Sequence, residues 1–182
     1  MIIGILIIIL LYLGLLTSEW LFIIFIIGVI LMLVCKKWKI PGLQYCIDRF
    51  ERPEHKKDFP GRGLVFFFLG AWLVVRFFPE DVALAALCIL TFGDAISPMI
   101  GVSNGRKKHP LNNSKLLEGS IAGTVAGFLT AWIFVAWWQA LIAAVVAMTI
   151  EALEIKIYEW DLDDNLTIPV VAAAVIFVLQ LI

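Results

Sequence analysis

Long apolar stretches, separated by short polar connections, run along the whole chain. Residues 2–35 are apolar apart from Thr17, Ser18 and Glu19. As a single helix this stretch would be about 50 Å long, whereas the hydrocarbon core of a bilayer is about 30 Å thick. We therefore predict two short helices that turn at residues 17–19.

Five further apolar segments follow, and turn residues separate them. Pro79 ends the first of these segments, and Pro98 and Gly101 break the pattern of the second. By residue number the five predicted helices are about 63–78, 82 to about 98, 119 onward, 140–157 and 167–182. The pattern predicts an all-α fold, a polytopic transmembrane bundle of about seven helices.

The composition supports a membrane protein. Hydrophobic residues make up 62% of the 182 positions, whereas a soluble domain is typically about 45–50% apolar. We predict one integral membrane domain over residues 1–182. Its expected parts are a helical hairpin (1–35), a basic cytoplasmic loop (36–62), and a core (63–182) with motif loops 103–118 and 158–166.

The positive charges predict the orientation. Of the 14 Lys and Arg residues, eight lie in residues 36–62 and four in 106–115. Loops rich in Lys and Arg stay in the cytoplasm. Helix alternation then puts the acidic connection 158–165 on the same face and predicts a cytoplasmic N-terminus. The first helix lacks the basic n-region and cleavage site of a signal peptide, so we expect it to be retained. Its isoleucine content suggests a prokaryotic cytoplasmic membrane.

Asp94 is the first candidate for chemistry, because it lies inside an apolar run. A carboxylate at membrane depth is costly unless it is paired, hydrated or bound to a metal. The alternative is that the helix ends early and Asp94 caps a turn near Gly93.

The motif loop after Asp94 carries glycines and cations. In GVSNGRKK (101–108), glycines allow close backbone approach, and Arg106 and Lys107 could neutralise phosphate oxygens. The order is not that of a Walker A motif. The alternative is a basic loop that obeys the positive-inside rule or contacts anionic lipid.

The segment KLLEGS (115–120) leads into the predicted helix that starts at residue 119. Glu118 suits the helix dipole there, or it could be a Mg²⁺ ligand. Gly119, Gly123 and Gly127 repeat every four residues, which is typical of close packing between membrane helices.

Two acidic groups follow. Glu151 and Glu154 share a helix face, where they could line a site or reach the interface. Residues 161–165 include Asp163, Asp164 and Asn165, which fit a Mg-nucleotide site or a plain acidic turn that caps the last helix.

The order of these motifs is more specific than each motif alone. ERPE and PGRG, then GDAISPMIGVSNGRKKHPLNNSKLLEGS, then DDNLTIP, resemble the CTP-dependent lipid kinase family, which includes dolichol, polyprenol and phytol kinases and a CTP-using diacylglycerol kinase. The resemblance covers about residues 50–170. One departure is that KKWK (36–39) lacks the histidine that follows a basic pair in many members.

The resemblance implies phosphoryl transfer from CTP to the hydroxyl of a membrane lipid alcohol, with Mg²⁺, at a site facing the cytoplasm. It implies Asp94, Glu118 and Asp164 as catalytic and metal-binding residues. The residues implied for nucleotide and phosphate binding are Arg62, Gly105, Arg106, Lys107, Lys115, Gly119, Ser120 and Asn165. The expected partners are CTP, the lipid alcohol and the bilayer, with no nucleic acid; the oligomeric state stays open.

Two other functions are open. A cytidylyltransferase would make a CDP-activated lipid from a lipid phosphate and CTP at a similar site. An ion-coupled transporter would use Asp94, Glu151 and Glu154 as an ion path, although transporters often consist of two similar halves and the chain has no internal repeat.

Overall fold

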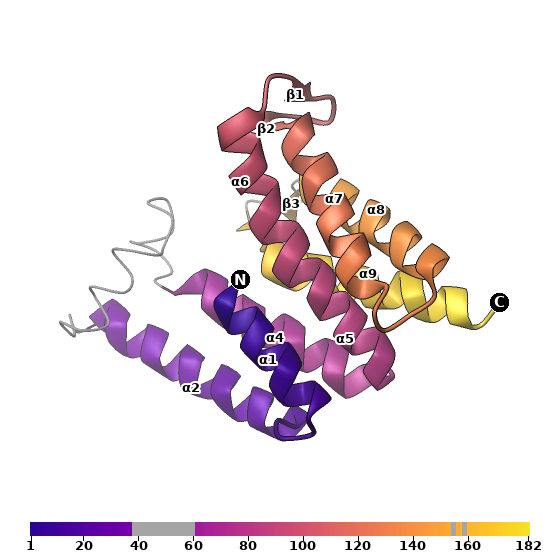
Figure 1. The fold of residues 1–182 in the computed structure, drawn as a ribbon. Helices are drawn as coiled ribbons and strands as arrows, with labels where there is room; N and C mark the ends of the chain where they lie inside the picture. The colour runs from indigo at the N-terminus through magenta and orange to yellow at the C-terminus, as the bar shows by residue number, and fades with distance from the viewer. Residues whose placement is uncertain (38–60, 154–155, 158–159) are drawn as a thin grey trace.

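The structure is a computed structural model that describes residues 1–37, 61–153, 156–157 and 160–182 (Figure 1). Helices dominate the described residues, so the predicted all-α class is confirmed there. The helical elements are α1 (Ile2–Tyr12), α2 (Ser18–Lys37), α4 (Arg62–Phe77), α5 (Glu80–Cys88), the π-helix η1 (Ile89–Asp94), α6 (Ala95–Asn104), α7 (Leu117–Ala131), α8 (Trp137–Leu153) and α9 (Asp164–Gln180).

The N-terminal stretch forms two helices, as its length predicted. The turn lies slightly earlier than expected, between Tyr12 and Ser18. Gly14 adopts a left-handed conformation with φ of 67°, which a residue without a Cβ adopts at little cost. Glu19 lies in the first turn of α2, where a negative charge suits the helix dipole.

The helix that contains Asp94 does not end at Pro98, contrary to the prediction. The helix runs without a break from Glu80 to Asn104, and Pro98 lies inside α6. Residues 89–94 form a π-helix just before the proline. Pro98 cannot donate a hydrogen bond to the carbonyl of Asp94, and its ring would crowd that carbonyl in a regular α-helix. The wider π turn accommodates the proline, so the helix continues.

Glycines bring α7 against η1 and α6. A Cβ on Gly123 would lie 2.6 Å from the carbonyl oxygen of Gly93, and a Cβ on Gly119 would lie 2.5 Å from that of Ser97. Such distances require bare backbone, so the two helices meet as the repeat of small residues predicted. Gly127 is less crowded, because its Cβ would come no nearer than 3.4 Å to Ile89.

This difference predicts opposite effects for two similar substitutions. Gly123→Ala should lower the free energy of unfolding by about 1–3 kcal/mol, because the new methyl overpacks the helix contact. Gly127→Ala should be neutral or stabilising by up to about 1 kcal/mol, because alanine favours the helix and its Cβ would make an ordinary van der Waals contact with Ile89. Thermal unfolding in detergent would measure both. Equal losses for the two variants would contradict the close approach at Gly123.

A second close contact joins α4 to α9. A Cβ on Gly70 would clash with the carbonyl oxygen of Asn165 and lie 3.1 Å from Pro169. Pro169 lies inside α9 and has no N–H to donate to that carbonyl. The α9 helix begins at Asp164, three residues before the predicted start, because Asp163 caps it by accepting a hydrogen bond from the Asn165 N–H.

Two short β-ribbons form where the sequence predicted loops and a helix end. Strand β1 (Lys108–His109) pairs with β2 (Asn112–Leu116) within motif loop 103–118. Strand β3 (Lys156–Ile157) pairs with β4 (Trp160–Asp161), so α8 ends at Leu153 and not at residue 157. In Figure 1 the first ribbon lies at the top, between the end of α6 and the start of α7.

Two helices of the described part are long and apolar enough to cross a membrane, Ser18–Cys35 and Glu80–Asn104. The basic loop predicted at 36–62 lies mostly outside the described residues, which resume at Gly61. The orientation of the N-terminus and the passage of each helix through a bilayer stay predictions.

Candidate active site

Three carboxylates from separate helical segments meet in one cluster, which we call the carboxylate cluster. Asp94 comes from the end of η1, Glu151 from the last turn of α8, and Asp164 from the first turn of α9. One carboxylate oxygen of each lies within 4.8 Å of the others. Like charges this close repel one another, so a positive charge or a shared proton among them would stabilise the arrangement.

Lys115 supplies a positive charge at this cluster. Its Nζ donates to Oε1 of Glu151 at 2.6 Å and to the backbone carbonyl of Glu151 at 2.7 Å. The same Nζ lies 3.9 Å from Oδ2 of Asp164. Lys115 belongs to strand β2, and the folding of the first ribbon brings it to Glu151 at the end of α8. The ribbon therefore positions the positive charge of the site.

Glu151 is the most deeply buried member of the cluster. The residue is only 4% exposed, and its Oε2 has no hydrogen-bond partner among the described residues. A buried carboxylate oxygen without a partner carries a desolvation cost that a bound cation would offset. Oxygen donors from one or two carboxylates, completed by substrate phosphates, are the ligands that Mg²⁺ takes in nucleotide sites. The donor set therefore fits a divalent cation.

Local structure explains why these side chains converge. The π-helix adds a residue to the turn before Asp94, and such bulges are common at functional sites because they redirect a side chain. Asp164 lies in the first turn of α9, where the helix dipole favours a negative charge. Glu151 needs no special backbone, because its helix simply ends beside Lys115.

Arg62 and Asn165, which the family resemblance implied in phosphate binding, lie beside the cluster and contact Asp163. The Nε of Arg62 is 3.4 Å from Oδ2 of Asp163, and its guanidinium lies over the ring of Phe66. The Nδ2 of Asn165 donates to Oδ1 of Asp163 at 2.9 Å. These contacts join the start of α4 to the start of α9 and so support the position of Asp164.

Glu118 is not in the carboxylate cluster found among the described residues. Both its carboxylate oxygens accept from the backbone N–H of Lys107, at 3.2 Å each. Hydrogen bonds from its own N–H and from those of Lys107 and Arg106 lower the pKa of the Glu118 carboxyl, and they outweigh the effect of desolvation. Glu118 thus holds the motif loop against the start of α7, outside both candidate spans.

The motif loop presents its cations outward. Arg106 and Lys107 are exposed, and the Lys107 carbonyl accepts from the N–H of Leu117. A Cβ on Gly105 would clash with the Gly101 carbonyl and with Leu116. Gly105, like Gly119, therefore lets backbone segments approach, and the cations on the loop remain available to an anionic ligand.

The structure brings together Asp94, Asp164 and Lys115 from the predicted residues and adds Glu151 to them. The sequence held a signal for Glu151, a carboxylate in an apolar helix that could line a site or reach the interface, but the resemblance implied Glu118 and not Glu151 as a metal ligand. Asp163 was expected either in a Mg-nucleotide site or in an acidic turn that caps the last helix, and no local pattern shows that Arg62 reaches it.

The comparison with curated proteins supports the same family as the motifs. Over 137 residues the chain is 26% identical to the CTP-dependent diacylglycerol kinase 1 of Schizosaccharomyces pombe, covering 65% of this chain and 60% of the relative. It is 34% identical over 110 residues to a probable phytol kinase of Glycine max (53% and 34%) and 30% identical over 114 residues to a farnesol kinase of Arabidopsis thaliana (55% and 36%). The chain is a homologue of lipid-alcohol kinases.

The predicted resemblance to the CTP-dependent lipid kinases is thereby confirmed. No protein-family model matches the chain, and no solved structure matches it. The chain spans about 60% of the length of the diacylglycerol kinases of Schizosaccharomyces pombe and Saccharomyces cerevisiae that it matches. A cytidylyltransferase or a transporter is not favoured by relatives that are kinases.

Proposed function

We propose that this chain is a CTP-dependent lipid kinase that transfers the γ-phosphoryl group of CTP to the hydroxyl of a lipid alcohol in the membrane. The observation that carries the proposal is the carboxylate cluster with the Lys115 ammonium against it. Phosphoryl transfer depends mainly on positioning and on neutralising phosphate charge. A set of oxygen donors beside lysine and arginine side chains provides both.

In this proposal the carboxylates of Asp94, Glu151 and Asp164 hold the magnesium ion of the nucleotide or, for one of them, accept the hydroxyl proton. When bound, the ion would neutralise charge on the phosphate oxygens. Arg106 and Lys107, exposed on the motif loop, bind the outer phosphates, and Glu118 keeps that loop folded against α7. Asn165 supports the position of Asp164, because its Nδ2 donates a hydrogen bond to the neighbouring Asp163.

Lys115 has two partners in this proposal. Without a nucleotide its ammonium offsets the charge of Glu151, and with a nucleotide it turns to the phosphates.

In the transfer itself, the bond between the γ-phosphorus and the bridging oxygen of CDP breaks, and a bond from the alcohol oxygen to that phosphorus forms. The hydroxyl proton passes to a carboxylate of the cluster, and CDP leaves.

The proposed arrangement in the membrane follows the positive-inside rule. The starts of α4 and α9, the end of α8 and strand β2 meet at one end of the helices. We propose that this end faces the cytoplasm, where CTP is available, and that the helices form a multi-pass bundle. The lipid alcohol then reaches the site from the bilayer.

Purified protein in nanodiscs, supplied with CTP labelled at the γ-phosphate, Mg²⁺ and either farnesol, phytol or diacylglycerol, tests the function. The expected products are CDP and a labelled lipid phosphate, with CTP preferred over ATP and UTP. Release of pyrophosphate from CTP and a lipid phosphate would instead identify a cytidylyltransferase. Cation flux in liposomes without nucleotide binding would identify a transporter.

A further inference from the structure

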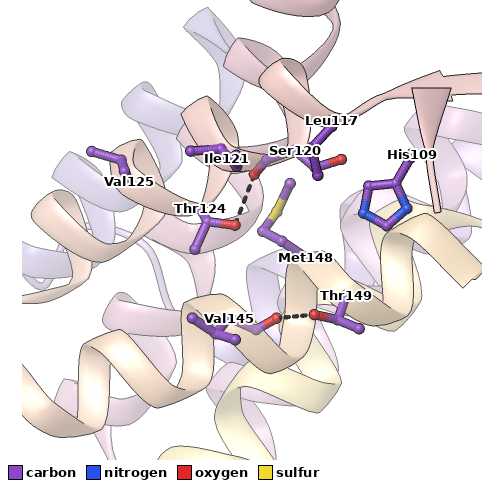
Figure 2. A pocket seen from close by; sticks show the side chains of 9 residues that line it. All are labelled: His109, Leu117, Ser120, Ile121, Thr124, Val125, Val145, Met148 and Thr149. Carbon is purple, nitrogen blue, oxygen red and sulfur yellow. Dashed lines mark hydrogen bonds between the residues drawn. The ribbon is translucent and has the colours of Figure 1, made fainter. Parts of the chain in front are cut away.

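An open groove of about 280 Å³ lies between α7 and α8, below the first ribbon (Figure 2). Its lining combines apolar side chains of both helices with His109 of β1. Ile121, Val125 and Val145 line it and are 45–55% exposed. In the proposed membrane bundle such exposed aliphatic side chains would contact lipid, so the groove would open toward the bilayer.

The two ends of the groove differ in polarity. Figure 2 shows His109 and Thr149 at one end and Val125 and Val145 at the other, with Ser120 between them. Thr149 lies two residues before Glu151, so the polar end is the end nearer the carboxylate cluster. A ligand that matches this groove is amphiphilic, with its polar end toward the candidate active site.

Of the three hydroxyl groups that line the groove, that of Ser120 lacks a hydrogen-bond partner among the described residues. Thr124 and Thr149 each donate to a carbonyl one turn earlier, at 2.8 and 2.7 Å. The Oγ of Ser120 is buried, the residue being 7% exposed, and it has no hydrogen-bond partner among the described residues. A buried hydroxyl without a partner carries a cost that a ligand's hydroxyl would remove.

His109 adds a second polar group at that end. Its Nδ1 accepts a hydrogen bond from the backbone N–H of Leu111 at 3.2 Å. In the neutral ring the proton therefore resides on Nε2, which makes that nitrogen a donor. The Nε2–H of His109 can donate a hydrogen bond to an alcohol oxygen, and the Oγ of Ser120 can accept one from the same hydroxyl group.

Met148 connects the groove to the carboxylate cluster. Its side chain lines the groove and also contacts Gly93, where an added Cβ would lie 2.9 Å from Sδ. Gly93 precedes Asp94, and Glu151 lies three residues after Met148 on the same face of α8. The flexible, unbranched side chain of Met148 thus reaches from the groove to the segment that precedes Asp94, and its helix carries Glu151.

We infer that the groove between α7 and α8 is the binding site of the acceptor lipid alcohol, with the hydroxyl at Ser120 and His109 and the tail along Val125 and Val145. The inference rests on the proposed function. From Val145 to Thr149 the groove is about 6 Å long at 1.5 Å per residue. It therefore holds the hydroxyl end and the first carbons, and the rest of the tail lies in the bilayer.

A farnesol analogue with a diazirine on the first carbons after its hydroxyl, bound to the full chain in nanodiscs without CTP, tests the inference by photolabelling. Label that excess farnesol removes, and that the corresponding hydrocarbon without a hydroxyl does not remove, is expected on peptides of α7 and α8. Val125→Trp and Val145→Trp should each reduce this label several-fold, because the indole fills the groove. Val178→Trp is the matched control, since Val178 is similarly exposed on α9.

A finer variant tests the hydroxyl contact. Ser120→Ala should weaken competition by farnesol roughly three- to tenfold, the effect of losing one hydrogen bond, and leave competition by the hydrocarbon unchanged. Thermal unfolding of each variant checks that the fold is retained. Label outside α7 and α8, or unchanged label in both tryptophan variants, would overturn the inference.

The two proposals can fail separately. If the wild-type chain phosphorylates farnesol and both tryptophan variants keep its KM for farnesol, the groove is not the acceptor site although the kinase function stands. If no alcohol is phosphorylated but the label maps to the groove as expected, the groove binds lipid alcohols and the kinase function is wrong.

Discussion

Glu151→Gln should abolish metal binding at the carboxylate cluster and lower the rate of phosphoryl transfer at least about a hundredfold, the usual cost of removing one group that stabilises transition-state charge. The substitution keeps the shape of the side chain and removes its charge. Glu151 is 4% exposed, and its Oε2 is without a hydrogen-bond partner among the described residues. The measurement is Mn²⁺ binding by electron paramagnetic resonance, together with transfer from labelled CTP.

Two glutamates serve as comparisons in this experiment. Glu80→Gln should change neither metal binding nor transfer, because Glu80 is exposed at the start of α5. Glu118→Gln separates the ligand set indicated by the sequence from that indicated by the structure. We expect it to raise the KM for CTP by loosening the motif loop and to leave Mn²⁺ binding nearly intact. Loss of Mn²⁺ binding in the Glu118 variant, with retention in the Glu151 variant, would show that the sequence-based set is the right one.

Lys115→Met should destabilise the metal-free protein and make its stability depend strongly on Mg²⁺. The ammonium lies 2.6 Å from Oε1 of Glu151, whose side chain is 5% exposed. Removing one partner of a buried ion pair typically costs about 3–5 kcal/mol, because the other charge is left uncompensated. A divalent cation at the cluster replaces the missing positive charge. The midpoint of thermal unfolding should therefore fall in EDTA and recover partly with Mg²⁺.

Activity and a second substitution separate charge from packing in this prediction. Lys115→Met should also slow phosphoryl transfer, because the lysine no longer contacts the phosphates. Lys107→Met, on the exposed loop, should leave the stability in EDTA unchanged. The double variant with Glu151→Gln should regain much of the lost stability, since the buried charge of Glu151 is then gone and only Asp94 and Asp164 remain in the cluster. If the single Lys115 variant is as stable as the wild type in EDTA, the ion pair is not what balances the cluster.

Much of this molecule follows from its residues alone. The length and apolarity of each segment determined the helices, because an apolar stretch bounded by turn residues has few other structures open to it. The small-residue repeat from Gly119 to Gly127 indicated a close helix contact, and Gly123 makes one with Gly93. Asp94, Asp164 and Lys115 stood out as polar residues beside apolar helices, and the family motifs named them.

Tertiary structure decided which polar groups meet. Pro98 was expected to end a helix, yet the π turn before it lets the helix continue. Local helix propensities do not show whether such a turn will accommodate a proline. Glu118 and Glu151 are both glutamates at helix ends. Which of them joins Asp94 and Asp164 depends on how the first ribbon folds back, bringing Lys115 to α8 and Lys107 to Glu118. Such pairings join residues far apart in sequence, so the sequence determined the groups and the packing determined the site.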